Sequence, residues 1–104
     1  LLNGDSSFSV PNAMMPCPLG PHCADQAERA KVSLDFARRA FARPDFLGWH
    51  WCGWMDGWKT IPGKEMRQHS GLQDPFGVRY QPMVAALSRF SDEMYGVALA
   101  GLDP

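Results

Sequence analysis

The stretch GWHWCGWMDGW, residues 48–58, holds all four tryptophans of the 104-residue chain. Its first half is short and aromatic, and it lies between the turn-forming pairs Pro44-Asp45 and Asp56-Gly57. A short apolar run bounded by turn residues is typical of a buried strand. The sequence therefore predicts a strand over Phe46–Trp54.

A helix is predicted on each side of this strand. From Asp25 onward, apolar residues recur at intervals of three and four, as on the buried face of a helix. Asp25 and Glu28 form a capping-box pattern at the start, and Pro44 closes the end. The predicted stripe is Ala27, Ala30, Leu34, Ala37 and Phe41, and the solvent face is Glu28, Arg29, Lys31, Asp35, Arg38 and Arg39. The second helix is expected to begin near Pro82, with Met83, Leu87, Phe90, Met94 and Val97 along its buried face.

The order of elements predicts the fold class. Leu1–Asn3 has the composition of the end of an earlier strand, so the chain reads strand, helix, strand, helix. That order indicates an α/β fold with a parallel sheet rather than a helical bundle. Two long segments, residues 5–24 and 55–81, follow the strands. Loops longer than about 12 residues are uncommon unless they are functional, and α/β proteins bind ligands at the carboxyl ends of their strands.

The tryptophans are candidates for contact with a sugar. Alternation along the strand places Trp49 and Trp51 on one face and His50 on the other, while Trp54 and Trp58 lie at or past its end. Indole rings stack on the C–H faces of sugars, and neighbouring polar groups bind the hydroxyls. We expect Trp49 to pack against the helices, and Trp51, Trp54 and Trp58 to contact the ligand.

Three carboxylates follow the predicted strands. Asp5 comes directly after the first strand, where it is either a catalytic nucleophile or base, or a turn residue. Asp56 holds the equivalent position after the second strand, and Glu65 lies further along. Each of these last two either binds hydroxyls or faces solvent.

The cysteines predict no metal site. Cys17, Cys23 and Cys52 form an odd set, so at least one thiol has no partner within the chain. Their spacings, including His50-x-Cys52, match no strong zinc pattern. A disulfide between Cys17 and Cys23 is the alternative if the protein is exported. His69 is expected to form hydrogen bonds within a loop, and no cofactor is predicted.

Composition excludes several partners. The chain is 45% hydrophobic, with ten basic and eleven acidic residues and a formal net charge of −1, as expected of one small folded domain. No basic stripe is present, so nucleic acid is not an expected partner. No apolar run approaches the roughly 18 residues of a membrane helix, and no membrane partner is expected. Phosphate-loop, Ser-His-Asp and dinucleotide patterns are missing from the sequence.

Four segments together resemble a known family. They are LLNGDSSF at residues 1–8, GWHW at 48–51 with Asp56 after it, GLQDPFG at 71–77, and YQPMV at 80–84. Taken in order, they resemble the last two strand–helix units of a clan A glycoside hydrolase barrel, of the agarase and beta-galactosidase types. The resemblance covers nearly the whole chain through short motifs.

This resemblance implies a (β/α)8 fold and retaining hydrolysis, in which two carboxyl groups lie ~5 to 5.5 Å apart. Asp5 falls at the nucleophile position, where the family carries a glutamate that is one methylene longer. The family's general acid follows the fourth strand, outside this chain. A barrel takes ~200 residues or more, so the resemblance implies a C-terminal portion whose sheet is completed by the rest of the barrel or by other copies.

The expected function is hydrolysis of O-glycosyl bonds in a galactoside or agar-type polysaccharide, by an enzyme of which this chain alone is inactive. The expected site comprises Asp5 as nucleophile and His50, Trp51, Trp54, Asp56, Trp58 and Glu65 as substrate-binding residues. Two alternatives stay open: a non-catalytic carbohydrate-binding protein of the same descent, and a Trp-rich protein-interaction domain. The chain begins with no basic leader. For the parent enzyme, a secreted or periplasmic location is favoured.

Overall fold

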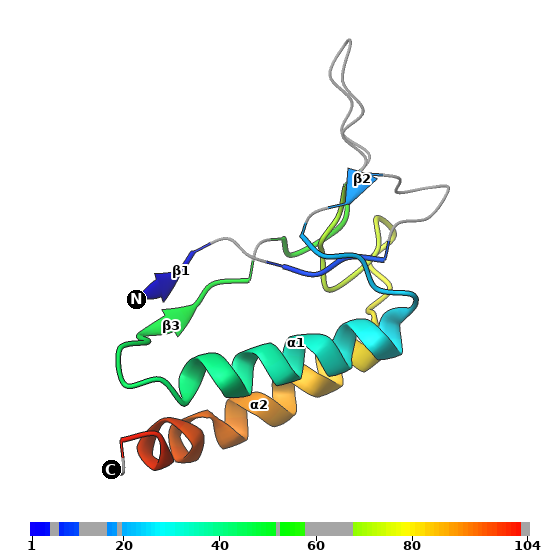
Figure 1. The fold of residues 1–104 in the computed structure, drawn as a ribbon. Helices are drawn as coiled ribbons and strands as arrows, with labels where there is room; N and C mark the ends of the chain where they lie inside the picture. Colours follow the sequence, from blue (N-terminus) through cyan, green and yellow to red (C-terminus); the bar gives the residue numbers. More distant parts are fainter. Residues whose placement is uncertain (5–6, 11–16, 19, 52, 58–67, 103–104) are drawn as a thin grey trace.

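The computed structural model of the chain describes residues 1–4, 7–10, 17–18, 20–51, 53–57 and 68–102 (Figure 1). In chain order, its elements are β1 (Leu2–Asn3), β2 (Cys17–Pro18), α1 (Gln26–Phe41), β3 (Gly48–Trp49), β4 (Gln68–His69) and α2 (Gln81–Ala100). The predicted α/β order, with one helix after β1 and another after β3, is confirmed. Four residues named above, Asp5, Cys52, Trp58 and Glu65, lie outside the described residues.

The strands form two separate parallel pairs. In the first, Leu2 of β1 lies opposite Gly48 of β3, and Asn3 lies opposite Trp49. In the second, β2 pairs with β4, so the two long segments that follow β1 and β3 pair with each other. The prediction of a strand over residues 46–54 is too long, because β3 pairs with β1 over only two positions.

Helix α1 begins where the sequence predicts. The Asp25 carboxylate accepts a hydrogen bond from the backbone N–H of Glu28 at 2.8 Å. The Glu28 carboxylate in turn accepts from the backbone N–H of Ala24 at 2.5 Å, one residue before the position that a standard capping box uses. Both side chains therefore satisfy amides that the helix itself leaves unpaired.

The buried face of α1 differs from the predicted stripe. Ala27 is exposed, whereas Arg29 is fully buried. The assignment of Arg29 to the solvent face is therefore wrong, and the hydrogen bonds described below explain how a guanidinium is accommodated there. The buried residues of the helix are Arg29, Ala30, Ser33, Ala37 and Ala40.

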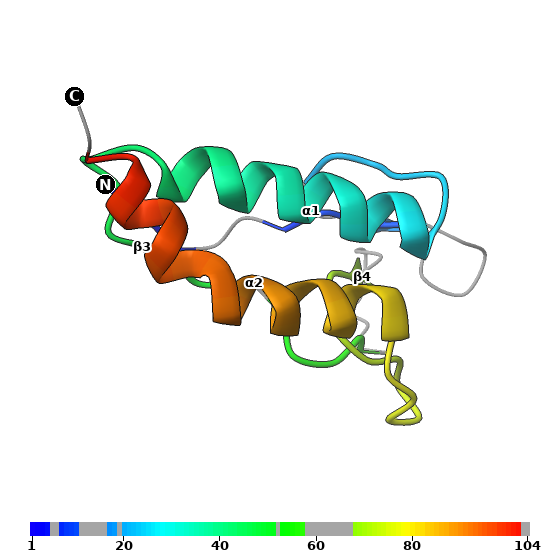
Figure 2. The ribbon, with the colours of Figure 1, turned by 90° about the horizontal axis from the view of Figure 1, so that it is seen from below.

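Helices α1 and α2 lie side by side and run in the same direction, opposite to β1 and β3 (Figures 1 and 2). As predicted, α2 buries Met83 and Phe90. The Phe41 ring of α1 contacts the Phe90 ring edge-on, with 5.0 Å between centroids. Neither described helix combines the length and apolar character that a membrane span needs.

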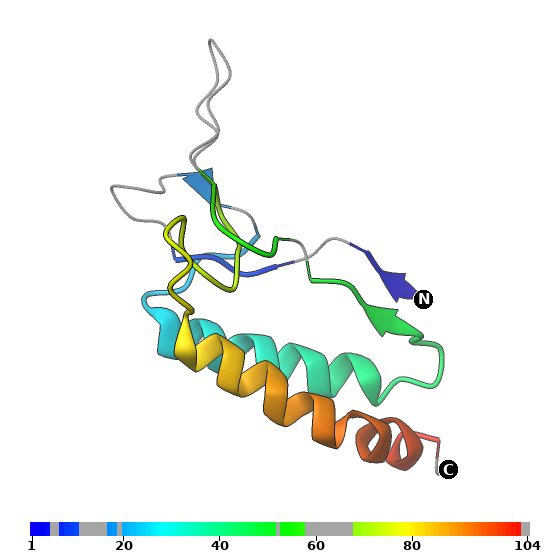
Figure 3. The same ribbon diagram turned by 180° about the vertical axis from the view of Figure 1, so that it is seen from behind.

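Both helices lie on one side of the β1–β3 pair. Among the described residues, no element covers the opposite side of these strands (Figure 3). In and beside these strands, Leu1, Leu2 and Leu47 are 67%, 62% and 82% exposed. Unpaired strand edges and bare leucines are features that folded proteins ordinarily cover.

Candidate functional site

Asp56 is the centre of a buried hydrogen-bond network at the carboxyl ends of β1 and β3. The residue is 2% exposed. Its Oδ1 accepts hydrogen bonds from the backbone N–H groups of Ser70 at 3.0 Å and Gly71 at 2.7 Å. Its Oδ2 lies 2.5 Å from both His69 Nδ1 and the Tyr80 hydroxyl. The carboxylate therefore uses both oxygens within the chain.

These bonds determine how Asp56 titrates. Burial alone would raise the pKa of this carboxyl, but the hydrogen bonds from His69, Tyr80 and Gly71 outweigh burial and lower the pKa. For Tyr80, burial and the hydrogen bond to Asp56 act in the same direction and raise the pKa of the phenol. At neutral pH the pair consists of an ionised carboxylate and a neutral hydroxyl that donates to it.

Arg29 is the cation that faces this carboxylate across a peptide segment. Its Nε donates to the Phe8 carbonyl at 2.7 Å, and its Nη2 donates to the carbonyls of Ser70 and Gly71 at 3.0 Å each. The backbone N–H groups of Ser70 and Gly71 thus donate to Asp56, while the carbonyls of the same two residues accept from Arg29. Burial lowers the pKa of Arg29, and the charge of Asp56 opposes that effect.

Side chains close the network into a ring. Arg29 Nη1 donates to Gln26 Oε1 at 3.1 Å, so the amide nitrogen of Gln26 faces His69 Nε2, 2.9 Å away. Because that nitrogen is a donor, His69 Nε2 must accept, and the His69 proton lies on Nδ1, where it reaches Asp56. We call this set the Arg29–Asp56 network; its members are Gln26, Arg29, Asp56, His69, Ser70, Gly71 and Tyr80.

Two glycines permit the close approach of the segments in this network. A Cβ on Gly71 would lie 2.6 Å from the Asp56 backbone nitrogen and 2.9 Å from its Oδ1. Gly53 has φ of +105°, and a Cβ there would lie 2.4 Å from Ser70 Oγ. A larger residue at Gly71 would displace the backbone that the carboxylate binds.

Trp49 and Trp51 face the helices. The Trp49 ring lies edge-on to Phe36 of α1, with 4.9 Å between centroids, and its packing role is confirmed. Trp51 donates from Nε1 to the Ser70 carbonyl at 2.7 Å, and the Arg29 guanidinium lies 5.3 Å from its ring centroid. The structure therefore gives Trp51 a role beside the network, and the sugar contact expected for it stays a prediction.

His50 and Asp56, the other described candidates near Trp51, have opposite environments. His50 is exposed, and its backbone N–H donates to the Asn3 carbonyl at 2.8 Å. Asp56 is buried, so the alternative that it faces solvent is wrong, and its binding of substrate hydroxyls stays a prediction. The reason for its burial is that four donors from within the chain surround its carboxylate.

Trp54 is the candidate with the most accessible ring, being 74% exposed. The Gln73 side-chain amide has one orientation in which both its oxygen and its nitrogen form hydrogen bonds. In it, Gln73 Oε1 accepts from Trp54 Nε1 at 2.9 Å, and Gln73 Nε2 donates to the Gly77 carbonyl at 3.2 Å. A pocket of about 180 Å³ adjoins this indole. We call it the Trp54 pocket; it is lined by Trp54, Leu72, Gln73, Arg79 and Val84.

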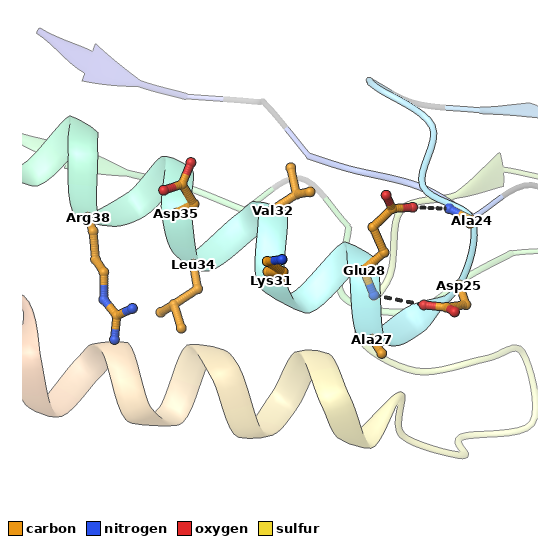
Figure 4. Close-up of a pocket in the computed structure, with 9 residues that line it drawn as sticks. All are labelled: Ala24, Asp25, Ala27, Glu28, Lys31, Val32, Leu34, Asp35 and Arg38. Atoms are coloured by element: carbon orange, nitrogen blue, oxygen red, sulfur yellow. Dashed lines mark hydrogen bonds between the residues drawn. The ribbon is translucent and has the colours of Figure 1, made fainter.

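A broader groove runs along α1, but it lacks convergent walls (Figure 4). All of its lining residues come from the single segment 24–38. Leu34 and Arg38 point toward α2, whereas Val32 and Asp35 point the other way. The groove is the outer surface of one helix, and none of the predicted site residues lines it.

The cysteine predictions are tested in part. Cys23 is buried and carries a free thiol, so the Cys17–Cys23 disulfide considered above is wrong. Burial, followed by the charge of Glu28, raises the pKa of the Cys23 thiol. Within the described part of the chain, no three His, Cys, Asp or Glu side chains are grouped as metal ligands.

The sequence interpretation missed Gln26, Arg29 and Tyr80 as members of the network. Gln26 and Arg29 lie three residues apart in the first turns of α1, and that spacing places them on one helix face. His69 was expected to form hydrogen bonds within a loop. The hydrogen bonding is confirmed, but His69 lies in β4 and one of its partners is Gln26 of α1.

Comparison with known proteins supports the fold. No protein-family model matches the chain, and no curated protein matches it. Among solved structures, an exo-beta-agarase matches 91% of the chain with a TM-score of 0.79 and 24% sequence identity. The protein PfGH50B matches 90% of it, with the same TM-score and 21% identity.

The chain spans only 13% and 14% of the length of these two structures. At such identities the likeness shows a shared α/β fold over one part of a much larger chain. An agarase is one of the enzyme types that the sequence motifs resemble.

Proposed function

We propose that this chain is the C-terminal portion of a (β/α)8-barrel glycoside hydrolase that cleaves a galactoside or agar-type polysaccharide. The observation that carries the proposal is the fold shared over 91% of the chain with one part of an exo-beta-agarase. The exposed leucines in and beside the β1–β3 pair support it, because they fit a sheet that further strands complete.

In this proposal the chemistry is divided between segments. Asp5 supplies the nucleophile by family resemblance, and the general acid comes from a strand outside these 104 residues. The reaction retains the anomeric configuration, since nucleophilic attack and hydrolysis each invert it. His50 and Trp54 are the described residues best placed to contact sugar, because both are exposed beyond or beside β3.

The test uses the protein encoded by the complete reading frame around this segment. We expect it to release products from agar-type oligosaccharides with retained configuration, as followed by proton NMR. Asp5→Ala should lower kcat by on the order of 10⁴-fold or more. Asp35→Ala, a change at an exposed site on α1, is the matched control and should leave kcat unchanged.

Two results would contradict this function. Turnover by the isolated 104-residue chain, abolished by Asp5→Ala, would show that no other segment is needed. Binding of the oligosaccharide by the complete protein without any hydrolysis would instead favour the non-catalytic carbohydrate-binding alternative.

A further inference from the structure

The Trp54 pocket shares no lining residue with the Arg29–Asp56 network, and it extends the sugar contact proposed above for Trp54. One wall comes from Trp54, in the segment after β3, and another from Val84 of α2. The others are Leu72, Gln73 and Arg79, which lie between β4 and α2. Side chains from two parts of the chain thus converge on one volume of about 180 Å³, well below the usual range for drug-sized ligands. That size fits a single sugar unit.

The pocket is held in shape by backbone hydrogen bonds. Leu72 N–H donates to the Trp54 carbonyl at 3.0 Å, and Asp56 N–H donates to the Gln73 carbonyl at 2.9 Å. The bond between Trp54 Nε1 and Gln73 fixes the indole as well. A rigid, exposed ring beside aliphatic side chains is a platform for the C–H face of a sugar, and its rigidity lowers the entropy lost on binding.

The charge of the pocket narrows the class of sugar. Arg79 is exposed, and no described residue forms an ion pair with it. Asp74, the acid of the same turn, is engaged through Oδ1 by the backbone N–H groups of Phe76 and Val78, at 2.9 Å each. A guanidinium presents paired donors that match the oxygens of a sulfate or carboxylate group.

We propose that the Trp54 pocket binds one unit of an anionic saccharide, with the sugar ring on the Trp54 indole and its sulfate or carboxylate group on Arg79. This inference rests on the proposed function for its polysaccharide class, and adds that the galactan is sulfated or otherwise acidic. The pocket selects such units because a neutral sugar leaves the guanidinium with water alone.

The test titrates the ¹⁵N-labelled 104-residue chain with a sulfated agar-type tetrasaccharide and, separately, with the same tetrasaccharide after desulfation. The sulfated probe should shift the Trp54 indole N–H and the Arg79 signals in NMR spectra and bind at least fivefold more tightly. Arg79→Gln should reduce its affinity to that of the desulfated probe. Trp54→Ala should remove binding of both, whereas Trp54→Phe should retain part of it.

Arg89→Gln is the matched control, since Arg89 lies on α2 and lines a different groove between the two helices. It should leave both affinities unchanged. Equal affinity for the two probes, signal shifts centred away from Trp54, or no shift at all would each overturn the inference.

The two proposals fail separately. If the complete protein hydrolyses agar-type oligosaccharides while the pocket ignores sulfation, only the inference is lost. If the pocket binds the sulfated probe but the complete protein releases no product, the proposed hydrolase activity is refuted, whereas the proposed saccharide binding by the pocket is supported.

Discussion

The two sides of the molecule differ in what they leave uncovered. Where the strands end, two buried charges, Arg29 and Asp56, are surrounded by hydrogen-bond partners from within the chain. Beside the β1–β3 pair, Leu2 and Leu47 are 62% and 82% exposed, and no described element covers them. The two buried charges are thus satisfied internally, while these exposed leucines are left to a neighbour.

This contrast shows which interactions the chain holds by itself. The Arg29–Asp56 network joins the segment after β1, the start of α1, the segment after β3 and the start of α2, and so fixes the loops relative to one another. The sheet has no comparable closure. The chain therefore contains a complete loop architecture on an incomplete sheet, as expected of part of a barrel.

The largest expected effect comes from removing the Asp56 carboxylate, which is the anion of the Arg29–Asp56 network. Asp56→Ala leaves four donors without an acceptor and Arg29 as an uncompensated buried charge, so we expect the free energy of unfolding to fall by about 3–5 kcal/mol. Urea denaturation of the isolated chain measures the loss. Asp35→Ala, which removes an exposed partner of Arg39, is the control and should change stability by less than about 0.5 kcal/mol. Equal losses in both variants would show that the network contributes nothing special.

The next effect tests the close approach at Gly71. Gly71→Ala places a methyl group 2.6 Å from the Asp56 backbone nitrogen, so we expect a loss of about 1–3 kcal/mol from backbone displacement. Gly96→Ala is the matched substitution, because Gly96 lies within α2 with no atom within 4 Å of its added Cβ. That change should stabilise the chain by about 0.5–1 kcal/mol. Opposite signs in thermal unfolding would confirm the contrast, and a stabilising Gly71→Ala would refute it.

A smaller effect comes from pH. The pKa of Asp56 is lowered on folding, so its contribution is present above an unfolded value of about 3.9 and is lost as the pH falls through the folded pKa. The pKa of Tyr80 is raised, so its contribution is present below an unfolded value of about 10 and is lost as the pH rises above it.

Urea midpoints measured from pH 2 to pH 11 should therefore fall at both ends. Tyr80→Phe should flatten the alkaline fall, in a Cys23→Ala background because burial also raises the pKa of that thiol. If the urea midpoint of the Tyr80→Phe variant still falls at alkaline pH, the loss of stability comes from another titrating group.

The smallest expected effect concerns Leu47, an exposed leucine beside the β1–β3 pair. Leu47 is 82% exposed, so Leu47→Ser should change the stability of the isolated chain by less than about 0.5 kcal/mol. In the complete protein, where we propose that further strands and loops cover this surface, the same change should cost about 1.5–3 kcal/mol. Similar values in the two contexts would mean that nothing covers Leu47.

Local patterns in the sequence predicted the elements that local physics determines. The Asp25–Glu28 capping pair marked the start of α1, and the apolar spacing along residues 83–97 identified the buried face of α2. The parallel order of β1 and β3 followed from the alternation of strands and helices. The first two features depend on residues only a few positions apart, and the third depends only on the order of elements along the chain.

The features that were missed depend on distant residues. Arg29 was assigned to solvent because a guanidinium is buried only when acceptors surround it, and its backbone acceptors lie 21 to 42 positions away. Asp56 was placed correctly at the end of a strand, but its role depends on donors 13 to 24 residues later. Periodicity within one helix or strand carries no information about such pairs.

The parallel course of the two helices has an electrostatic consequence. Their amino ends lie at the same end of the molecule (Figure 1). Asp25 and Glu28 offset the partial positive charge of α1, whereas α2 has no acid in its first turn, and the Tyr80 side chain bonds to Asp56 instead of capping the helix. No acid in the first turn of α2 therefore offsets the roughly half elementary charge beside Arg79. The reach of this charge is set by ionic strength, since counter-ions shorten the field to ~10 Å in 0.1 M salt.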